Sequence, residues 1–266
     1  MYDRFNRRIN YLRISVTDRC NLRCTYCMPE CGVDLISHKD VLSFEEILEV
    51  VEVSVGLGVD KVRITGGEPL VRKGIVDLVG MIARVKGIKD LAMTTNGTLL
   101  DKFATPLKKA GLHRVNISLD TMDADKYSTI TRVGNIEHVL TGINSAKEAG
   151  LKPIKVNCVI KSTPMEEDAR QVAAFCKKND LEVRFIKEMD LEEGVFARVI
   201  GGDGGHCKSC NRLRLTANGK VKPCLFNELE FDVRELGVEQ AILRSIGQKP
   251  KSGTENKINK FSNIGG

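Results

Sequence analysis

The sequence predicts an α/β protein built as a partial, open parallel β/α barrel of about six strand–helix units, followed by a small cysteine-bearing region. Three observations support this fold. The chain has 266 residues, 42% of them hydrophobic, which is enough to bury a substantial core. Strand-like segments alternate with amphipathic stretches over most of the chain. Within several strands, apolar and polar side chains also alternate, which predicts a barrel with a hydrophilic interior.

The predicted strands are short runs rich in aliphatic and β-branched residues: Tyr11–Thr17, Lys61–Thr65, Leu91–Thr95, Arg114–Asp120, Pro153–Ile160 and Glu182–Met189. The stretches between them with helical periodicity include Ser43–Gly56, Ile75–Val85, Asn135–Ala149 and Met165–Lys178. Ser43 and Glu46 have the spacing of a capping box. Helical crossovers imply a parallel sheet, with functional groups at the carboxyl ends of the strands.

The polar positions of the strands are expected to line the barrel. In the first strand Leu12, Ile14 and Val16 alternate with Arg13, Ser15 and Thr17. Parallel strands that are covered on both faces are apolar throughout, so this alternation predicts a hydrophilic lumen that is open at one end. The alternative is a set of antiparallel strands with one face in solvent, which the helical crossovers disfavour.

Composition limits the classes of function and ligand. There are 41 Lys and Arg against 35 Asp and Glu, a net charge of +6 in mixed-sign runs, which fits a small anionic ligand and not nucleic acid. No apolar run is long enough to span a membrane and no signal peptide is visible, so we expect a cytoplasmic protein with no membrane partner. Nine cysteines, an odd number, are expected to be reduced and partly metal-binding.

Composition also divides the chain into three parts. Residues 1–190 carry the strand and helix alternation, and residues 191–246 begin with a glycine-rich stretch and then carry cysteines. Residues 247–266 form a polar segment that we expect to be a flexible tail.

The first cysteine set follows the first strand as C-x3-C-x2-C, formed by Cys20, Cys24 and Cys27. Thiolate sulfur suits zinc or an iron–sulfur cluster. Structural zinc needs four ligands, and the nearby Cys31 and His38 give no familiar zinc spacing. Three thiolates on a four-iron cluster leave one iron open to a chelating molecule. The spacing therefore favours a cluster over zinc, with inert core cysteines as a third alternative.

The second cysteine set is Cys207, Cys210 and, after thirteen intervening residues, Cys224. His206 is the candidate fourth ligand of a zinc site, but it is adjacent to Cys207, which makes joint ligation awkward. Arg212 and Arg214 lie between these cysteines on one face of a predicted strand. Two guanidiniums beside a cluster with an open iron would bind a phosphorylated ligand; two arginines on a solvated strand are the alternative. The fold prediction thus includes a small carboxyl-terminal iron–sulfur region.

The first cysteine motif, with Tyr26 before its third cysteine, resembles the signature of the radical S-adenosylmethionine (SAM) superfamily. The next strand ends in Gly66-Gly67-Glu68-Pro69, similar to the GGEP motif of that superfamily. Glycines allow a close backbone approach, and the carboxylate of Glu68 would accept a hydrogen bond from the methionine ammonium of SAM.

The two cysteine sets, the Arg-Leu-Arg segment and the terminal diglycine together resemble the GTP 3′,8-cyclase family of molybdenum cofactor biosynthesis, over nearly the whole chain. The resemblance implies two 4Fe-4S clusters with three cysteine ligands each, SAM as cofactor, GTP as substrate and an external electron donor, and it leaves a homodimer open. SAM-binding positions by resemblance are Tyr26, Gly67, Glu68, Ser118 and Met189. GTP-binding positions are Arg13, Arg63, Thr94, Lys155, Arg212, Leu213 and Arg214, and the tail positions are Gly265 and Gly266.

The resemblance implies that no side chain is itself the catalyst: a 5′-deoxyadenosyl radical made from SAM takes hydrogen from C3′ of GTP, and C3′ then bonds to C8 of guanine. The alternatives are another radical SAM enzyme acting on a different nucleotide or on a peptide, and a non-enzymatic electron-transfer or sensing protein with two clusters. One departure from the family is the segment between Met189 and Cys207, which has only seventeen residues and is shorter than is usual in the family. We expect this shorter segment to reduce the cover over the barrel mouth, and it leaves a nucleotide-acting relative as an alternative.

Overall fold

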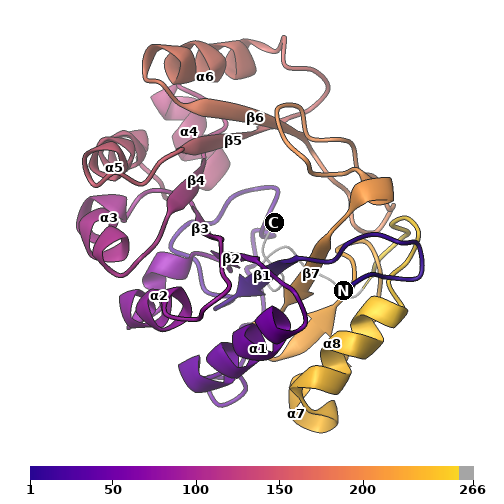
Figure 1. Cartoon of the computed structure of the whole chain (residues 1–266). Coiled ribbons are helices and arrows are strands. Elements are labelled where there is room, and N and C mark those ends of the chain that lie inside the picture. Colours follow the sequence, from indigo (N-terminus) through magenta and orange to yellow (C-terminus); the bar gives the residue numbers. More distant parts are fainter. Residues whose placement is uncertain (258–266) are drawn as a thin grey trace.

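The computed structural model describes residues 1–257 and contains one curved sheet with helices on its outside (Figure 1). The parallel strands run in the order β6-β5-β4-β3-β2-β1, and β7, also parallel, pairs with β1 and continues into the antiparallel strands β8 and β9. The strands are β1 (Tyr11–Ser15), β2 (Lys61–Thr65), β3 (Asp90–Thr95), β4 (Arg114–Ser118), β5 (Lys155–Ile160), β6 (Glu182–Lys187), β7 (Arg212–Leu215), β8 (Lys220–Lys222) and β9 (Phe231–Asp232).

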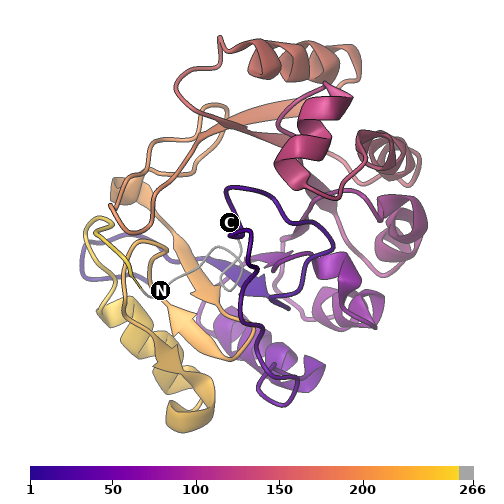
Figure 2. The same ribbon diagram turned by 180° about the vertical axis from the view of Figure 1, so that it is seen from behind.

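The helices cover the convex face of this sheet, and the segment between β1 and α1 crosses one end of the barrel (Figure 2). The helices are α1 (Phe44–Gly56), α2 (Ile75–Ala83), α3 (Leu100–Lys109), α4 (Ala124–Thr131), α5 (Ile136–Glu148), α6 (Glu167–Lys178), α7 (Val233–Leu236) and α8 (Val238–Gly247). Two single turns of 3₁₀ helix are η1 (Pro69–Val71) and η2 (Cys207–Ser209). Among residues 1–257, no helix is long and apolar enough to cross a membrane.

The predicted open parallel barrel is confirmed, and the antiparallel alternative is wrong because β1 to β6 pair in parallel throughout. Each predicted strand is present, although β1, β4 and β6 end two residues earlier than expected. Ser43 and Glu46 form the predicted capping box at the start of α1. The sequence prediction missed the pairing of β7 with β1, which joins segments 201 residues apart (Tyr11 with Arg212) and leaves no local pattern.

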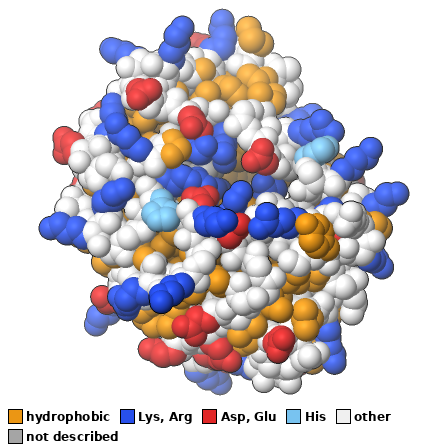
Figure 3. Space-filling model, in the orientation of Figure 1, with side chains coloured by type: hydrophobic (Ala, Val, Ile, Leu, Met, Phe, Trp, Pro, Cys, Tyr) orange, Lys and Arg blue, Asp and Glu red, His pale blue; other side chains and the backbone are white. Residues whose placement is uncertain are grey.

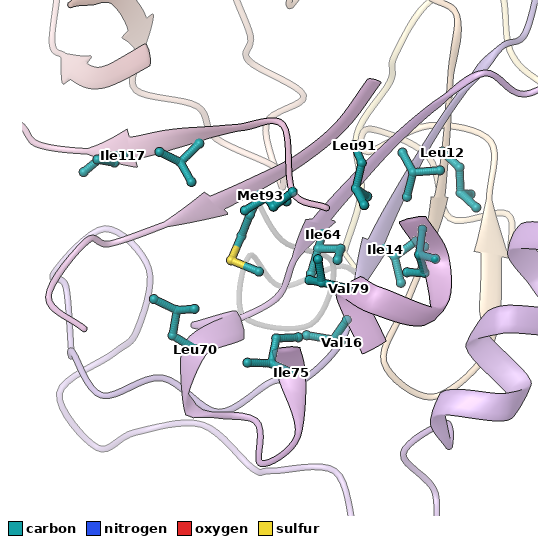
Figure 4. Close-up of a cluster of buried hydrophobic side chains, with 14 of the residues drawn as sticks. Leu12, Ile14, Val16, Ile64, Leu70, Ile75, Val79, Leu91, Met93 and Ile117 are labelled. Atoms are coloured by element: carbon teal, nitrogen blue, oxygen red, sulfur yellow. The ribbon is translucent and has the colours of Figure 1, made fainter. Parts of the chain in front are cut away.

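The main core lies between the sheet and the helices. Leu12, Ile14 and Ile64 are fully buried on the helix side of β1 and β2. Figure 4 shows Ile64 and Val16 beside Val79 and Ile75 of α2. Burying each such side chain stabilises the fold by about 1.5–3 kcal/mol. The apolar positions of the strands therefore face the helices, and the alternate polar positions are left for the lumen, as predicted.

A second, smaller apolar cluster lies under the segment that connects β6 to β7. Leu191, Leu225 and Phe226 form its buried centre, with Met189 and Phe196 packed against them. The rings of Phe196 and Phe226 have centroids 4.6 Å apart. This cluster fixes the short connection against the loop that follows β8.

The first part of the predicted carboxyl-terminal tail is packed against the barrel. Lys249 and Asn256 are fully buried, and the Asn256 amide donates hydrogen bonds to the carbonyls of Leu225 and Asn227. Composition indicated a free segment because these residues are polar, but each of them finds backbone acceptors. The predicted tail residues Gly265 and Gly266 lie outside the described residues.

Candidate active site

The first cysteine set lies in the loop after β1, at the carboxyl ends of the strands. The Cys24 carbonyl accepts hydrogen bonds from the amides of Cys27 and Met28, at 3.0 and 2.9 Å, which folds the motif into a tight turn. The Leu22 amide donates to the sulfur of Cys20 over 3.4 Å. The three thiols are half-buried and free, as a ligand set must be to bind a metal centre.

Burial and mutual proximity raise the pKa values of these thiols. Burial and then the neighbouring Cys27 and Cys20 raise the pKa of Cys24 to about 12. Burial and then Cys20 raise the pKa of Cys27 to about 11. Three thiolates held this close repel one another, so the set suits a positively charged iron–sulfur core that binds all three.

The glycine turn after β2 packs directly on this loop. A Cβ on Gly66 would lie 2.5 Å from the Thr17 carbonyl oxygen, and one on Gly67 would lie 2.4 Å from that of Arg19. The Gly67 and Glu68 amides donate to the same two carbonyls at 2.7 and 2.8 Å. The glycines of the GGEP motif thus allow the backbone contact that positions the cysteine loop.

Glu68 is fully buried at the base of this turn. Its carboxylate accepts hydrogen bonds from the Leu70 amide, the Thr95 hydroxyl and the Asn96 amide, at 3.0, 2.7 and 2.7 Å. Burial raises the pKa of Glu68 to about 7, against these hydrogen bonds. Two carboxylate oxygens have about four acceptor sites, so one remains for a further donor. The arrangement joins the ends of β2 and β3.

A small cavity of about 30 Å³ lies beside Cys24, lined by Tyr26, Ser118 and Asp120 among others. The Tyr26 hydroxyl donates a 2.8 Å hydrogen bond to Asp120, whose other oxygen accepts from the Val159 amide. Two predicted SAM-binding residues, Tyr26 and Ser118, are therefore close to the first cysteine set. Asp120, at the end of a predicted strand, was expected only to line the lumen with the other polar strand positions, and it lies instead beside this small cavity.

A larger cavity of about 400 Å³ occupies the lumen of the barrel, and basic side chains gather around a hollow in the middle of the face shown in Figure 3. Arg13 of β1 lies in register between Arg63 of β2 and Arg214 of β7, so three guanidinium side chains come from adjacent strands. The basic lining residues are Arg13, Lys61, Arg63, Arg114, Arg184, His206, Arg212 and Arg214, and the acidic ones are Asp90 and Asp203.

The arginines of this cavity destabilise one another's protonated, charged forms. Burial and then Arg214 lower the pKa of Arg13 well below its usual value, and burial and then Arg212 lower the pKa of Arg214 to about 10. The Tyr11 ring lies between two of these cations, with its centroid 5.5 Å from the guanidinium carbons of both Arg63 and Arg212. A bound polyanion would relieve the mutual repulsion.

Several buried polar atoms of the side chains that line the lumen make no hydrogen bond within the described residues. Among residues 1–257 the Nε atoms of Arg63 and Arg184 and the hydroxyl of Thr94 are buried without a hydrogen bond. Unsatisfied buried groups of this kind are rare in folded proteins, so these atoms fit a polar ligand that would pair with them. The predicted GTP-binding residues Arg13, Arg63, Thr94, Arg212 and Arg214 all line this one cavity.

Two predicted GTP-binding side chains do not line the cavity. The Lys155 ammonium forms an ion pair with Glu182 on the neighbouring strand. Leu213 is fully buried in the main core, so only its main chain remains for a ligand. Conversely, Tyr11, Arg114 and Arg184 line the cavity without having been predicted. Strand alternation placed each of them on the polar face, which was the signal available in the sequence.

The second cysteine set lines the same cavity. Cys207 begins η2, the Cys210 amide donates to the Cys207 carbonyl at 3.2 Å, and Cys224 follows β8. Met189, predicted to contact SAM, also lines this cavity. Among the described residues no three His, Cys, Asp or Glu side chains converge on a point for a single ion. A four-iron cluster binds each thiolate through a different iron, so it does not need such convergence.

The remaining three cysteines belong to neither of the two cysteine sets. Cys158 of β5 and Cys176 of α6 are buried in the main core, where each packs as a small apolar side chain. Cys31 is exposed in the loop before α1.

Comparisons with known proteins agree with this geometry. Residues 14–176 match the model of the radical SAM superfamily, and residues 203–260 match that of the molybdenum cofactor synthesis C region. Proteins named GTP 3′,8-cyclase from Thermodesulfovibrio yellowstonii and Petrotoga mobilis are 41% and 38% identical, each over 100% of both chains. A GTP 3′,8-cyclase from Alkaliphilus oremlandii is 40% identical over 94% of this chain and 93% of its own.

The alignment with the first of these relatives spans 322 positions, more than the 266 residues of this chain, so the relative has residues at many positions where this chain has none. Solved structures give the same fold. Streptococcus suis SuiB bound to S-adenosylmethionine superimposes with a TM-score of 0.67 at 18% identity, over 91% of this chain and 64% of its own. The protein anSMEcpe with bound AdoMet gives 0.62 at 18% identity, over 91% of this chain and 78% of its own.

The match over most of the barrel, and the identity to curated relatives along the full chain, place this protein in the radical SAM superfamily, where it belongs to the GTP 3′,8-cyclase family.

Proposed function

We propose that this chain cyclises GTP to 3′,8-cyclo-7,8-dihydro-GTP, the first step of molybdenum cofactor biosynthesis. The observation that carries the proposal is a single cavity lined by arginines from β1, β2, β4, β6 and β7 together with all three cysteines of the second set. Guanidiniums are suited to the oxygens of a triphosphate, and the thiols that line the same cavity are suited to a metal centre.

The first cysteine set holds a 4Fe-4S cluster, with Cys20, Cys24 and Cys27 as its ligands. With SAM bound, this centre supplies the radical chemistry that removes the hydrogen atom from C3′ of the ribose. The chain contributes the geometry around it: the glycine turn fixes the cysteine loop against β2, and Tyr26 and Ser118 border the cavity beside Cys24. Gly67, Glu68 and Met189 complete the SAM-binding set that we propose.

We assign a second 4Fe-4S cluster to Cys207, Cys210 and Cys224. Burial raises the pKa of the Cys210 thiol, but Lys249 and then Arg212 and Arg214 lower it more, so the net shift is downward. A thiolate that is stabilised in this way is a good ligand for iron. These three thiols line the cavity and would hold the cluster with one iron left without a cysteine ligand, which would be open to the guanine end of GTP.

The triphosphate is held by the arginines of the lumen. Arg13, Arg63 and Arg214 stand side by side in register, and Arg212 lies across the Tyr11 ring from Arg63. A bound polyanion would neutralise these cations, so the lumen favours such a ligand. The surrounding barrel would keep water from the reacting carbon. Lys155 would join this set by leaving Glu182, whereas Leu213 would act through its main chain.

The reaction also needs an external reductant and a reducing environment. Cleaving the carbon–sulfur bond of SAM consumes one electron, and the cyclised nucleotide radical takes up one electron and one proton. All nine cysteines are free, which supports a location in the reducing environment of the cytoplasm. A peptide substrate is less well matched to a cavity of about 400 Å³ crowded with guanidiniums.

Binding of GTP to arginine variants tests the substrate assignment. The double variant Arg212→Ala with Arg214→Ala should weaken GTP binding by about a hundredfold, or about 2.7 kcal/mol, while SAM cleavage without GTP persists. Arg170→Ala with Arg244→Ala removes the same charge from exposed helix positions and should bind GTP normally. Equal loss of GTP binding in both double variants, or loss of SAM cleavage together with GTP binding in the first, would refute the assignment.

A further inference from the structure

Lys249 is a buried cation beside the second cysteine set. Its side chain is 1% exposed, and its ammonium donates hydrogen bonds to the carbonyls of Arg212, at 2.7 Å, and of Pro223. Arg212 follows Cys210 by two residues, and Pro223 immediately precedes Cys224. Burial lowers the pKa of Lys249, against the charges of the nearby Cys210 and Cys224, which raise it. One ammonium therefore joins the two chain segments that carry these cysteines.

A second buried cation, Arg7, has a different charge balance. Its guanidinium donates to the carbonyls of Cys207 and Pro250, at 2.8 and 2.7 Å. Asp3 balances its charge through an ion pair of 2.6 Å with both side chains buried. Arg7 thus ties Cys207 to the segment that carries Lys249 without leaving a net charge.

Lys249 has no such acidic partner. Among residues 1–257 no carboxylate forms an ion pair with it, and the interactions that favour its charged form come from Cys210 and Cys224. Burying an ammonium without an opposite charge is costly. The opposite charge has to come from the cysteine set, because no other anion is in reach among the described residues.

We propose that Lys249 is a positioning residue for the second metal centre, an inference that rests on the second cluster assigned above. Three thiolates outweigh the positive charge of an oxidised four-iron core, so the centre is an anion that becomes more negative on reduction. The fixed charge of Lys249 stabilises this anion, which retains the cluster and makes its reduction easier.

Lys249 acts on the centre and not on the substrate. It does not line the lumen cavity, whereas Arg212 and Arg214 do. Its two hydrogen bonds, to the carbonyls of Arg212 and Pro223, hold the strand that carries the two arginines at a fixed distance from the turn before Cys224. Its effect should therefore appear in the cluster itself, in the absence of GTP.

The test uses the full chain with both clusters reconstituted anaerobically. Lys249→Met removes charge and hydrogen bonds, Lys249→Gln keeps hydrogen-bond donors without the charge, and Lys251→Met is the matched control at an exposed position two residues later. Iron content is measured for each variant, and cluster potentials are measured by redox titration followed by electron paramagnetic resonance. Added SAM identifies the first cluster by perturbing its signal, and circular dichroism reports folding.

We expect Lys249→Met to keep the SAM-responsive cluster but to hold about twofold less iron than the wild type, because the second cluster is lost. Lys249→Gln should retain the second cluster with a more negative reduction potential, and Lys251→Met should match the wild type in both measurements. Full iron in Lys249→Met together with an unchanged second potential in Lys249→Gln would overturn the role of Lys249. If Lys249→Met does not fold, the potential of Lys249→Gln decides alone. A wild-type chain that forms only the SAM-responsive cluster would instead refute the second centre itself.

Discussion

The hydroxyl of Tyr26 donates a 2.8 Å hydrogen bond to Asp120, which joins the first cysteine motif to the loop after β4. The other oxygen of Asp120 accepts from the Val159 amide of β5, so three parts of the barrel rim meet at this carboxylate. Burial raises the pKa of Asp120, and the hydrogen bonds from Val159 and Tyr26 oppose that shift. The aromatic residue before the third cysteine is thus held in place by its hydroxyl as well as by packing.

Tyr26→Phe should lower the free energy of unfolding by about 1–2 kcal/mol, because it leaves a buried carboxylate oxygen without its donor. The same variant should weaken SAM binding, since the ring that borders the cavity beside Cys24 is no longer held by its hydroxyl. Denaturant titration and equilibrium binding of SAM measure the two effects. Tyr2→Phe is the control, because Tyr2 is 64% exposed. Equal stability of the two variants would contradict this account.

Gly67→Ala should strongly reduce assembly of the first metal centre, because the added Cβ would lie 2.4 Å from the Arg19 carbonyl and push the cysteine loop away from β2. We expect SAM cleavage to fall by at least about tenfold, with SAM-responsive cluster content falling in parallel. Gly56→Ala, at the end of α1, meets no atom within 4 Å and should behave as the wild type. Normal cluster content in Gly67→Ala would show that the close backbone contact is not required.

Tyr11→Leu should weaken GTP binding by about tenfold, because it removes the ring face that separates Arg63 from Arg212. Tyr11→Phe keeps that face and should bind GTP nearly as the wild type does. The Tyr11 hydroxyl has no hydrogen-bond partner among the described residues, so its loss should not destabilise the fold. If Tyr11→Phe binds GTP as weakly as Tyr11→Leu, the hydroxyl and not the ring makes the contribution.

Glu68 should make the stability of the cofactor-free protein depend on pH. Burial raises its pKa to about 7 from an ordinary value of 4.5. Between these values the folded chain holds a proton that the unfolded chain has lost, so the stabilising contribution is present at low pH and disappears as pH rises through about 7. From pH 5 to pH 7 the wild type should lose about 2 kcal/mol relative to Glu68→Gln. Parallel stability curves for the two proteins in denaturant titrations would contradict the shift.

The fold was largely predictable because its determinants are local. Alternation along β1 separated the core side chains Leu12 and Ile14 from the lumen side chain Arg13, and the structure places all three as expected. The cysteine spacings and the GGEP turn likewise lie within short segments of the chain. Each of these features depends on strand geometry or on neighbouring residues, so the sequence alone indicates it.

Features that depend on contacts between distant segments were not predictable. The register between Arg13 and Arg214 depends on β7 pairing with β1, which adds the second cysteine set to the lumen. Lys249 lies in a segment whose polar composition indicated a flexible tail. It is nevertheless fully buried, and its ammonium donates hydrogen bonds to carbonyls of two other segments. The ion pair between Lys155 and Glu182 also depends on a strand pairing that composition does not reveal.

The most direct measurement is an anaerobic reaction of the reconstituted chain with SAM, dithionite and GTP, with nucleotide and nucleoside products separated by chromatography and identified by mass spectrometry. The account predicts 5′-deoxyadenosine together with 3′,8-cyclo-7,8-dihydro-GTP, and deuterium at C3′ of GTP should appear in the 5′-deoxyadenosine. Formation of 5′-deoxyadenosine without any cyclised nucleotide, or without deuterium transfer, would contradict it.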